Sequence, residues 1–272
     1  MRVVTIIKNI CFLVLLLITT LFIFSSAGSN YSQAELLARN SGESKPYKLL
    51  KEMTQYISRH DNVTFKAEVM YDRVRDDGIK IQRTGSEKVF VQKPDKLFIE
   101  FKTDFYSDWL LYNKNTATYL DTTTNKYTSI NEIPGSINTA LDFLENSFGF
   151  VMPLSNLIYI YPYKKIVKNV QSAEYVGTSN VFGVRCHHLL FEEYDKYWQI
   201  WIEDGKRRIP RKVVVTYKTE PQAPQFIAII NDWIFNEPFS PKMFDQNLKK
   251  NARPSADNLF RERSESKISI FD

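Results

Sequence analysis

Residues 184–217 read VRCHHLLFEEYDKYWQIWIEDGKRRIPRKVVVTY and contain three short runs rich in β-branched and aromatic residues. Residues that favour turns separate these runs, at Asp195 and again at Asp204–Gly205. Short runs of this composition, divided by such turns, are typical of neighbouring antiparallel strands. The stretch therefore predicts a three-stranded antiparallel meander.

Alternation within the second run assigns its side chains to two faces. Successive side chains of a strand point to opposite sides, so Trp198, Ile200 and Ile202 share one face and Gln199 lies on the other. Trp201 falls on the polar face and interrupts the pattern. One side of the meander is therefore predicted to face an apolar interior.

Strand-like runs continue through most of the chain at intervals of about eight to twelve residues. This spacing favours one continuous antiparallel sheet of about eleven strands, and a sheet of that many strands curls. We therefore predict a mainly β protein with some α-helix. The predicted strands are 63–71, 79–92, 97–101, 105–112, 116–121, 126–130, 171–177, 184–193, 197–203, 211–217 and 225–235.

Three other segments have the spacing of helices. After Pro46, apolar residues recur every three or four positions over 49–57, which predicts an amphipathic helix packed on the sheet. A second helix is predicted to end at Gly149, and a third segment covers 154–160 and is closed by Pro162. Because no linker-like composition surrounds the last two, we expect them to lie across the sheet within a single domain.

Several motifs resemble those of a bacterial family of predicted periplasmic proteins, known as domain of unknown function 2092. The most specific are CHHLLF at 186–191, WQIWIEDG at 198–205 and PRKVVVTYK at 210–218, because no generic strand requires that order of residues. The resemblance covers roughly residues 47–239 and includes further matches at 94–97, 154–161, 175–178, 221–225 and Trp233.

This resemblance implies a fold similar to that of the bacterial lipoprotein carriers and receptors of the LolA and LolB type. In that fold, a single antiparallel sheet is strongly curved into a half-barrel, and helices close the hollow on its concave face. The resemblance implies the same form for the sheet of about eleven strands expected here. The family has no established activity, so the resemblance implies a fold and a periplasmic location but no reaction.

Composition and charge narrow the class of partner. The 272 residues are 43% hydrophobic, which is enough for one good core. The formal net charge of +5 is mild and spread along the chain, so no nucleic-acid partner is expected. Cys11 lies in the N-terminal apolar run, so Cys186 would be alone in a processed chain and no intramolecular disulfide could form there.

The N-terminus has the features of an export signal. Arg2 and Lys8 precede an apolar run over 10–24, and small residues follow it up to Ala27. We expect cleavage after Ala27, with an uncleaved inner-membrane anchor as the alternative. Either outcome places the chain in the periplasm, close to a membrane.

The remaining chain divides into three parts by composition. After the signal peptide or anchor at 1–27, residues 28–46 are polar and read as a linker. The carrier-like domain is expected over 47–246, because the strand and helix patterns fill that range. Residues 247–272 mix basic residues with serine and asparagine, which predicts a polar, disordered tail.

The sequence Cys186-His187-His188 has the residue types of a metal or nucleophile site. On a strand, however, Cys186 and His188 share a face while His187 points the other way, so the three cannot converge on one ion or substrate. The sequence has no phosphate-binding glycine loop and no Gly-x-Ser-x-Gly or His-Glu-x-x-His motif. We therefore predict no catalytic residue, no metal and no cofactor.

The apolar face of the curved sheet is the remaining candidate site. A curled sheet closed by helices surrounds a hollow that would suit an acyl chain, whereas helices that fill it completely would leave an ordinary core. We predict an exported, non-enzymatic binding protein that holds a lipid or an acylated partner behind a movable lid at 139–160. The residues expected to line the hollow are Val69, Leu97, Phe101, Trp198, Ile200, Ile202 and Val215.

Two other functions stay open on the sequence alone. The chain could be a structural or sensory module of the cell envelope that binds protein partners through its sheet edges or its tail. It could also be an enzyme whose dispersed site leaves no sequence motif. Deleting residues from 247 onward would separate the first alternative from a lipid carrier, since a carrier should tolerate that loss.

Overall fold

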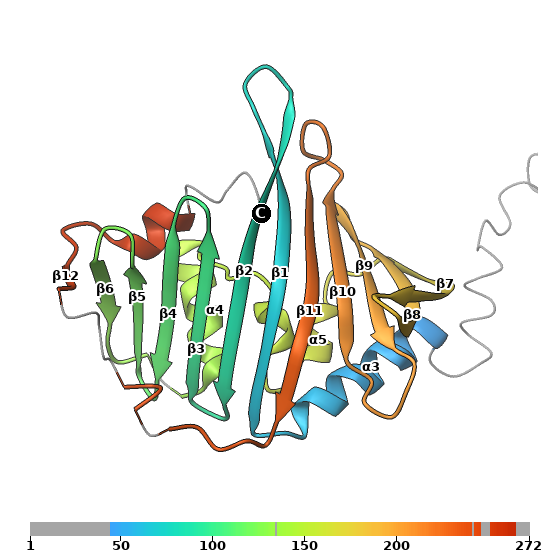
Figure 1. Ribbon diagram of the computed structural model, residues 1–272, viewed down its shortest axis with the longest axis horizontal. Coiled ribbons are helices and arrows are strands. Elements are labelled where there is room, and N and C mark those ends of the chain that lie inside the picture. Colours follow the sequence, from blue (N-terminus) through green and yellow to red (C-terminus); the bar gives the residue numbers. More distant parts are fainter. Residues whose placement is uncertain (1–43, 134, 241, 246–250, 265–272) are drawn as a thin grey trace, which may run out of the picture. The chain divides into compact units, whose positions relative to one another are not determined.

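An open, curled sheet of twelve strands dominates the computed structural model, which describes residues 44–133, 135–240, 242–245 and 251–264 (Figure 1). The strand order is β12-β6-β5-β4-β3-β2-β1-β11-β10-β9-β8-β7. The strands are β1 (Asn62–Val74), β2 (Lys80–Gln92), β3 (Lys96–Thr103), β4 (Ser107–Asn113), β5 (Thr116–Asp121), β6 (Lys126–Ile130), β7 (Ser172–Val181), β8 (Val184–Glu192), β9 (Lys196–Glu203), β10 (Pro210–Tyr217), β11 (Gln225–Phe235) and β12 (Arg253–Pro254).

The strand pattern read from the sequence accounts for β1 to β11. The meander is present as β8, β9 and β10, with Trp198 of β9 opposite Phe191 on one side and Val215 on the other. The prediction of about eleven strands omitted β12, which pairs in parallel with β6. Every other pair in the sheet is antiparallel, and β1 lies between β2 and β11 at its centre.

Trp201 interrupts the alternation of β9 because the second face of the sheet has a small apolar cluster of its own. Trp201 packs there with Cys186 and Val214. Its ring stacks on His188 at 4.0 Å between centroids, and its indole N–H donates to Ser179 at 2.9 Å. A large ring on this face is therefore covered by its neighbours across the strands.

The helices α3 (Lys45–Ser58), α4 (Ile137–Phe148) and α5 (Pro162–Ile166) lie on one side of the sheet (Figure 1). The amphipathic face expected near the start of the domain is buried, since Leu50 and Met53 of α3 have no exposed surface. These helices and the inward side chains of the strands share one hydrophobic core. Burial of this shared apolar surface is the main stabilisation of such an arrangement.

The predicted second helix is present as α4, and its ends have clear local causes. Ser136 caps its first turn, and Gly149 follows it in the left-handed conformation that glycine adopts without strain. The third helical segment was predicted wrongly. Only the 3-10 turn η1 (Ser155–Leu157) forms there, and Pro162 begins α5 instead of closing a helix. Proline suits the first position of a helix because its missing N–H would have no partner there.

Residues 251–264 pack against the sheet, although the sequence predicts a solvated tail over 247–272. After β12, residues 259–264 are helical. Phe260 is fully buried and its ring contacts those of Tyr119, Phe148 and Phe150. The prediction was wrong for these residues because a single apolar residue in a polar stretch, Phe260, makes its contacts with rings that lie far away in the sequence.

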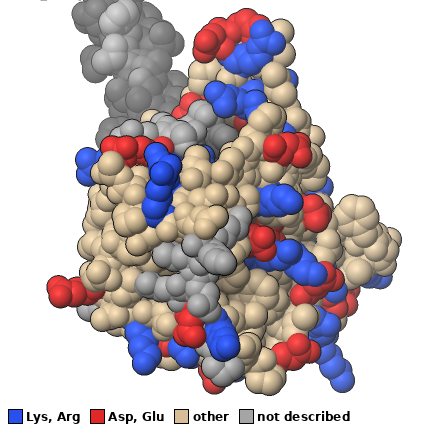
Figure 2. Space-filling view, turned by 60° about the vertical axis from the view of Figure 1, so that its left-hand side comes forward, with Lys and Arg blue, Asp and Glu red and all other residues tan. Residues whose placement is uncertain are grey.

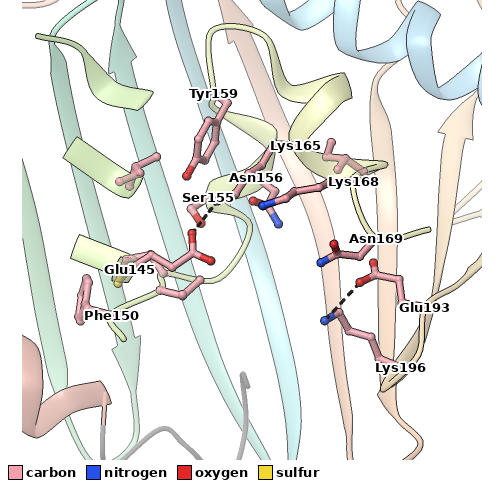
Figure 3. Close-up of a pocket in the computed structure, with 14 residues that line it drawn as sticks. Glu145, Phe150, Ser155, Asn156, Tyr159, Lys165, Lys168, Asn169, Glu193 and Lys196 are labelled. Atoms are coloured by element: carbon pink, nitrogen blue, oxygen red, sulfur yellow. Dashed lines mark hydrogen bonds and ion pairs between the residues drawn. The ribbon is translucent and has the colours of Figure 1, made fainter. Parts of the chain in front are cut away.

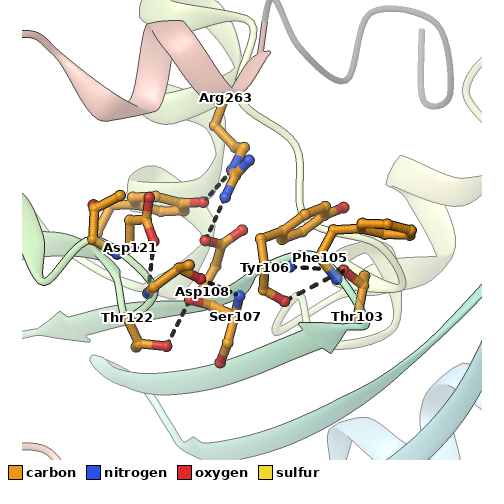
Figure 4. Close-up of polar contacts among 11 residues, drawn as sticks. Thr103, Phe105, Tyr106, Ser107, Asp108, Asp121, Thr122 and Arg263 are labelled. Atoms are coloured by element: carbon orange, nitrogen blue, oxygen red, sulfur yellow. Dashed lines mark hydrogen bonds and ion pairs between the residues drawn. The ribbon is translucent and has the colours of Figure 1, made fainter.

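A buried ion pair accompanies this aromatic contact (Figure 4). The guanidinium of Arg263 donates to Oδ1 of Asp108 at 2.7 Å and to the hydroxyl of Tyr119 at 2.8 Å. Asp108 has no exposed surface, so its charge depends on such a partner. The C-terminal segment therefore completes the interior at one end of the sheet.

Parts of three predicted segments lie outside the described residues: the export signal and most of the linker, within 1–43, and residues 247–250 and 265–272 of the predicted tail. None of the helices in the described part is long and apolar enough to cross a membrane.

Basic and acidic side chains are interspersed on the face drawn in Figure 2. The protruding β1–β2 hairpin also carries both signs, with Arg75 and Asp77 paired at 2.6 Å.

Candidate functional site

A chamber of about 260 Å³ lies between the sheet and the helical insertion. Strands β9 and β10 supply Trp198, Ile200, Val213 and Val215 to its lining, and the irregular segment 151–157 supplies another part. The strand residues recur at every second position, so one face of the meander forms this wall. The chamber is slightly smaller than the roughly 300–1,000 Å³ typical of small-molecule pockets.

A polar recess of about 180 Å³ continues from the chamber (Figure 3). The polar residues that line both the chamber and the recess lie where the two join; they are Glu145, Ser155, Asn156, Glu193 and Lys196. Beyond this junction the recess is lined by Lys168 and Asn169, from the segment that follows α5. The site thus passes from an apolar interior to a polar end.

Lys165 of α5 is held by two carboxylates at this recess. Its Nζ lies 2.6 Å from Oε2 of Glu145 and 3.1 Å from Oδ1 of Asp142. Burial disfavours the charge of Lys165, but its hydrogen bonds to Glu145 and Asp142 outweigh that effect and raise its pKa. The hydroxyl of Tyr159 also donates to Asp142 at 2.8 Å. These contacts tie α4 to the segment around α5.

Glu193 and Trp198 form a second polar contact at the junction. The indole N–H of Trp198 donates to Oε1 of Glu193 at 2.8 Å, and Nζ of Lys196 lies 3.5 Å from Oε2. The Trp198 ring also stacks on Phe191, with centroids 4.2 Å apart. Trp198 therefore lines the chamber and positions a buried carboxylate at the same time.

Lys168 differs from the other two lysines of the recess. It is exposed, and no carboxylate within the described residues forms an ion pair with it. Lys165 and Lys196 are both paired, the latter also with Asp195 at 3.2 Å. Of the described residues that line the recess, Lys168 is thus the cation whose charge is available to a bound molecule.

A model of the family described as "Predicted periplasmic protein (DUF2092)" matches residues 47–254. The chain belongs to this family. The motifs centred on residues 186–218 were therefore identified correctly, and the family description agrees with the predicted periplasmic location. No curated protein matches the chain.

Solved structures with a similar fold are distant in sequence from this DUF2092 protein. Lipoprotein LppX of Mycobacterium tuberculosis is 11% identical, with 72% of this chain and 99% of that chain covered and a TM-score of 0.45. LprF from Mycobacterium bovis is 10% identical, with 74% and 100% covered and a TM-score of 0.40. The LolA superfamily protein NE2245 from Nitrosomonas europaea is 5% identical, with 74% and 98% covered and a TM-score of 0.38.

The seven residues predicted to line the hollow all belong to the core of this DUF2092 protein or pack against it. Three of them, Trp198, Ile200 and Val215, line the chamber. The other four are almost fully buried in the same core and do not line the chamber; they are Val69, Leu97, Phe101 and Ile202. The structure therefore places the chamber over one half of the predicted face.

The polar end of the site was not predicted from the sequence. Glu145, Lys165, Lys168 and Glu193 come from three different segments, and no local pattern links them. One signal was available: lysines at 164, 165 and 168 follow the proline that begins α5, so a basic cluster on a short helix could have been noticed.

Cys186, His187 and His188 do not form one site. Cys186 is buried beside Trp201, and burial raises the pKa of its thiol to about 11. His188 stacks on Trp201. Nε2 of His187 lies 3.1 Å from Oδ1 of Asp204, and its Nδ1 lies 3.1 Å from the hydroxyl oxygen of Tyr175. Within the described residues, no group of three or more His, Cys, Asp or Glu side chains is arranged to hold a metal ion.

Proposed function

We propose that this chain is a periplasmic binding protein that holds a lipid or an acylated partner, and that it acts by binding and not by catalysis. The observation that carries the proposal is the apolar chamber over Trp198, Ile200 and Val215, which continues into a polar recess. An amphiphile has its apolar and polar parts in the same order, since an apolar chain is followed by a polar head. The helices would then close the concave face of the sheet around the chain.

The affinity would come from burying methylene groups, each of which contributes about 0.8 kcal/mol. A long acyl chain needs more room than about 260 Å³, so the segment 139–160 would have to move outward as a lid. Leu154 within this segment has a φ of 58°, which is unfavourable for a residue other than glycine. Release of that strain would offset part of the cost of opening.

A substitution that adds a larger side chain to the chamber wall tests the proposal better than one that removes a side chain from it. Trp198→Ala would also remove the contacts of Glu193 and Phe191, so loss of binding would have two explanations. Val215→Phe instead adds volume at a half-buried wall position. Val176→Phe, on the exposed edge strand β7, is the matched control.

The measurement is native mass spectrometry of protein purified from a periplasm, followed by lipid extraction. We expect acyl species on the natural chain and on Val176→Phe, and little or none on a folded Val215→Phe variant. Circular dichroism establishes that each variant is folded. If the natural chain carries no acyl species and takes none up when lipid is added, the proposal is wrong.

A second candidate, an envelope module that binds protein, is favoured by the outer edge of β7, which pairs with no further strand among the residues that the structure describes. An unpaired strand edge can accept a strand from a partner. Val176→Lys places a charge on this edge and should abolish such binding while leaving lipid binding unchanged. Deletion from residue 247 no longer separates the candidates, because residues 251–264 pack against the core.

A further inference from the structure

The polarity of the site gives a bound amphiphile one orientation. The wall that β9 and β10 supply to the chamber is apolar, the junction carries Glu145, Glu193 and Lys196, and Lys168 and Asn169 line only the polar recess. An acyl chain would therefore occupy the chamber, and its head group would lie in the recess beside Lys168. The reverse orientation would bury a polar head among apolar side chains without hydrogen-bond partners.

The charges of the recess select a head group with one negative charge. Lys165 and Lys196 are already paired with carboxylates, so among the described residues of the recess Lys168 is the cation that can pair with a ligand. A single anionic group beside Lys168 gains a charge-assisted hydrogen bond. Glu145 and Glu193 are balanced by Lys165 and Lys196, so a second negative charge would find no free cation among the described residues of the recess. It would lose its hydration without compensation, which is a basis of selectivity.

The size of the chamber favours a single apolar chain. At about 260 Å³ it is slightly below the usual range for drug-sized ligands, roughly 300–1,000 Å³. Lid motion could enlarge it for one long chain, but two chains side by side would also need room between the sheet and α3. Leu50 of α3 lines the chamber and is fully buried, so that space is already filled.

We propose that the ligand is a single-chain amphiphile with one negative charge, whose anionic group binds Lys168 in the polar recess. This inference rests on the proposed lipid-binding function and defines the class of molecule bound. A free fatty acid carboxylate and a phosphodiester head group share the required chemistry.

The test compares four palmitoyl probes by isothermal titration calorimetry below their critical micelle concentrations: palmitate, palmitoyl lysophosphatidylglycerol, neutral monopalmitoylglycerol and palmitoyl lysophosphatidic acid. Measurements at about pH 8 keep the last of these doubly charged, since the second pKa of a phosphomonoester is about 6. The variants are Lys168→Gln and, as matched control, Lys164→Gln, which changes an exposed lysine of α5 outside the recess.

We expect at least one of the two singly charged probes to bind about tenfold more tightly than the neutral probe, as one charge-assisted hydrogen bond would give. Which of them binds more tightly distinguishes a fatty acid from a phosphodiester lipid. Lys168→Gln should remove the preference, and Lys164→Gln should keep it.

Three results would overturn the inference. Equal binding of charged and neutral probes, or tightest binding of the doubly charged probe, would refute the charge selection while leaving the chamber as an acyl-chain site. Failure of all four probes to bind, the neutral one included, would refute both the inference and the proposed function.

Discussion

Replacing Arg263 by leucine should strongly destabilise the domain, because the change leaves a buried carboxylate without its cation. The Asp108 side chain has no exposed surface, and its Oδ1 lies 2.7 Å from Nη2 of Arg263. The Arg263 side chain is 19% exposed and also contacts Tyr119 and the ring of Tyr106. Water can therefore replace little of what the guanidinium provides.

The expected magnitude follows from this burial. Breaking a buried ion pair by removing one partner costs about 3–5 kcal/mol, whereas an exposed pair contributes about 1 kcal/mol or less. For a domain of this size, 1 kcal/mol shifts the melting temperature by about 2–4 °C. Arg263→Leu should therefore lower the melting temperature by roughly 6–20 °C.

The assay is thermal and urea-induced unfolding of a double-mutant cycle. Asp108→Asn combined with Arg263→Leu removes both charges, so the pair should recover most of the loss. Arg261→Leu, which changes an exposed residue of the same helical turn, should stay within about 0.5 kcal/mol of the natural chain. If Arg263→Leu behaves like Arg261→Leu, the C-terminal segment is not docked on Asp108 in solution and the reasoning fails.

Three further predictions concern single side chains. Trp198→Phe keeps a ring against Phe191 but removes the donor to Glu193, so unfolding should become easier by about 1–3 kcal/mol, measured by urea titration. Burial lowers the pKa of Lys93 from the ordinary 10.5 to about 8. The unfolded chain then binds more protons between about pH 8 and pH 10, so the free energy of unfolding should rise with pH there in the natural chain but not in Lys93→Gln. Cys186, buried and with its pKa raised to about 11, should react with a maleimide at neutral pH only when the chain is unfolded; rapid labelling of the folded protein, followed by mass spectrometry, would contradict this burial.

The strands could be predicted because their signals are local. A two-residue period and turn residues such as Asp204–Gly205 lie within the segments they describe. The first helix could be predicted for the same reason, since the apolar stripe of α3 is complete within the segment. The family-like motifs added the expectation of a curved sheet, which no single strand specifies; the sheet is open and curled.

The chamber and the docked C-terminal segment could not be predicted, because each depends on contacts between distant residues. Segment 151–157 has no regular period, so the sequence does not indicate that it faces Ile200 and Val215. Phe260 and Arg263 are two residues in a polar stretch. What they contribute to stability depends on their contacts with Tyr119 and Asp108, which lie far away in the chain. A pattern-based prediction treats such residues as solvated.

The central position of β1 has a consequence for the order of folding. Val63 near the start of the domain pairs with Phe235 near its end, and Tyr71 pairs with Phe226. Strands β1 to β6 can form hairpins as they become available, but the two halves of the sheet cannot join until β11 has left the ribosome. Contacts of such long sequence separation make folding slow. A chain with this topology cannot complete its central sheet until residues up to 235 are available, and this delay suits a periplasmic protein, which is synthesised in one compartment and works in another.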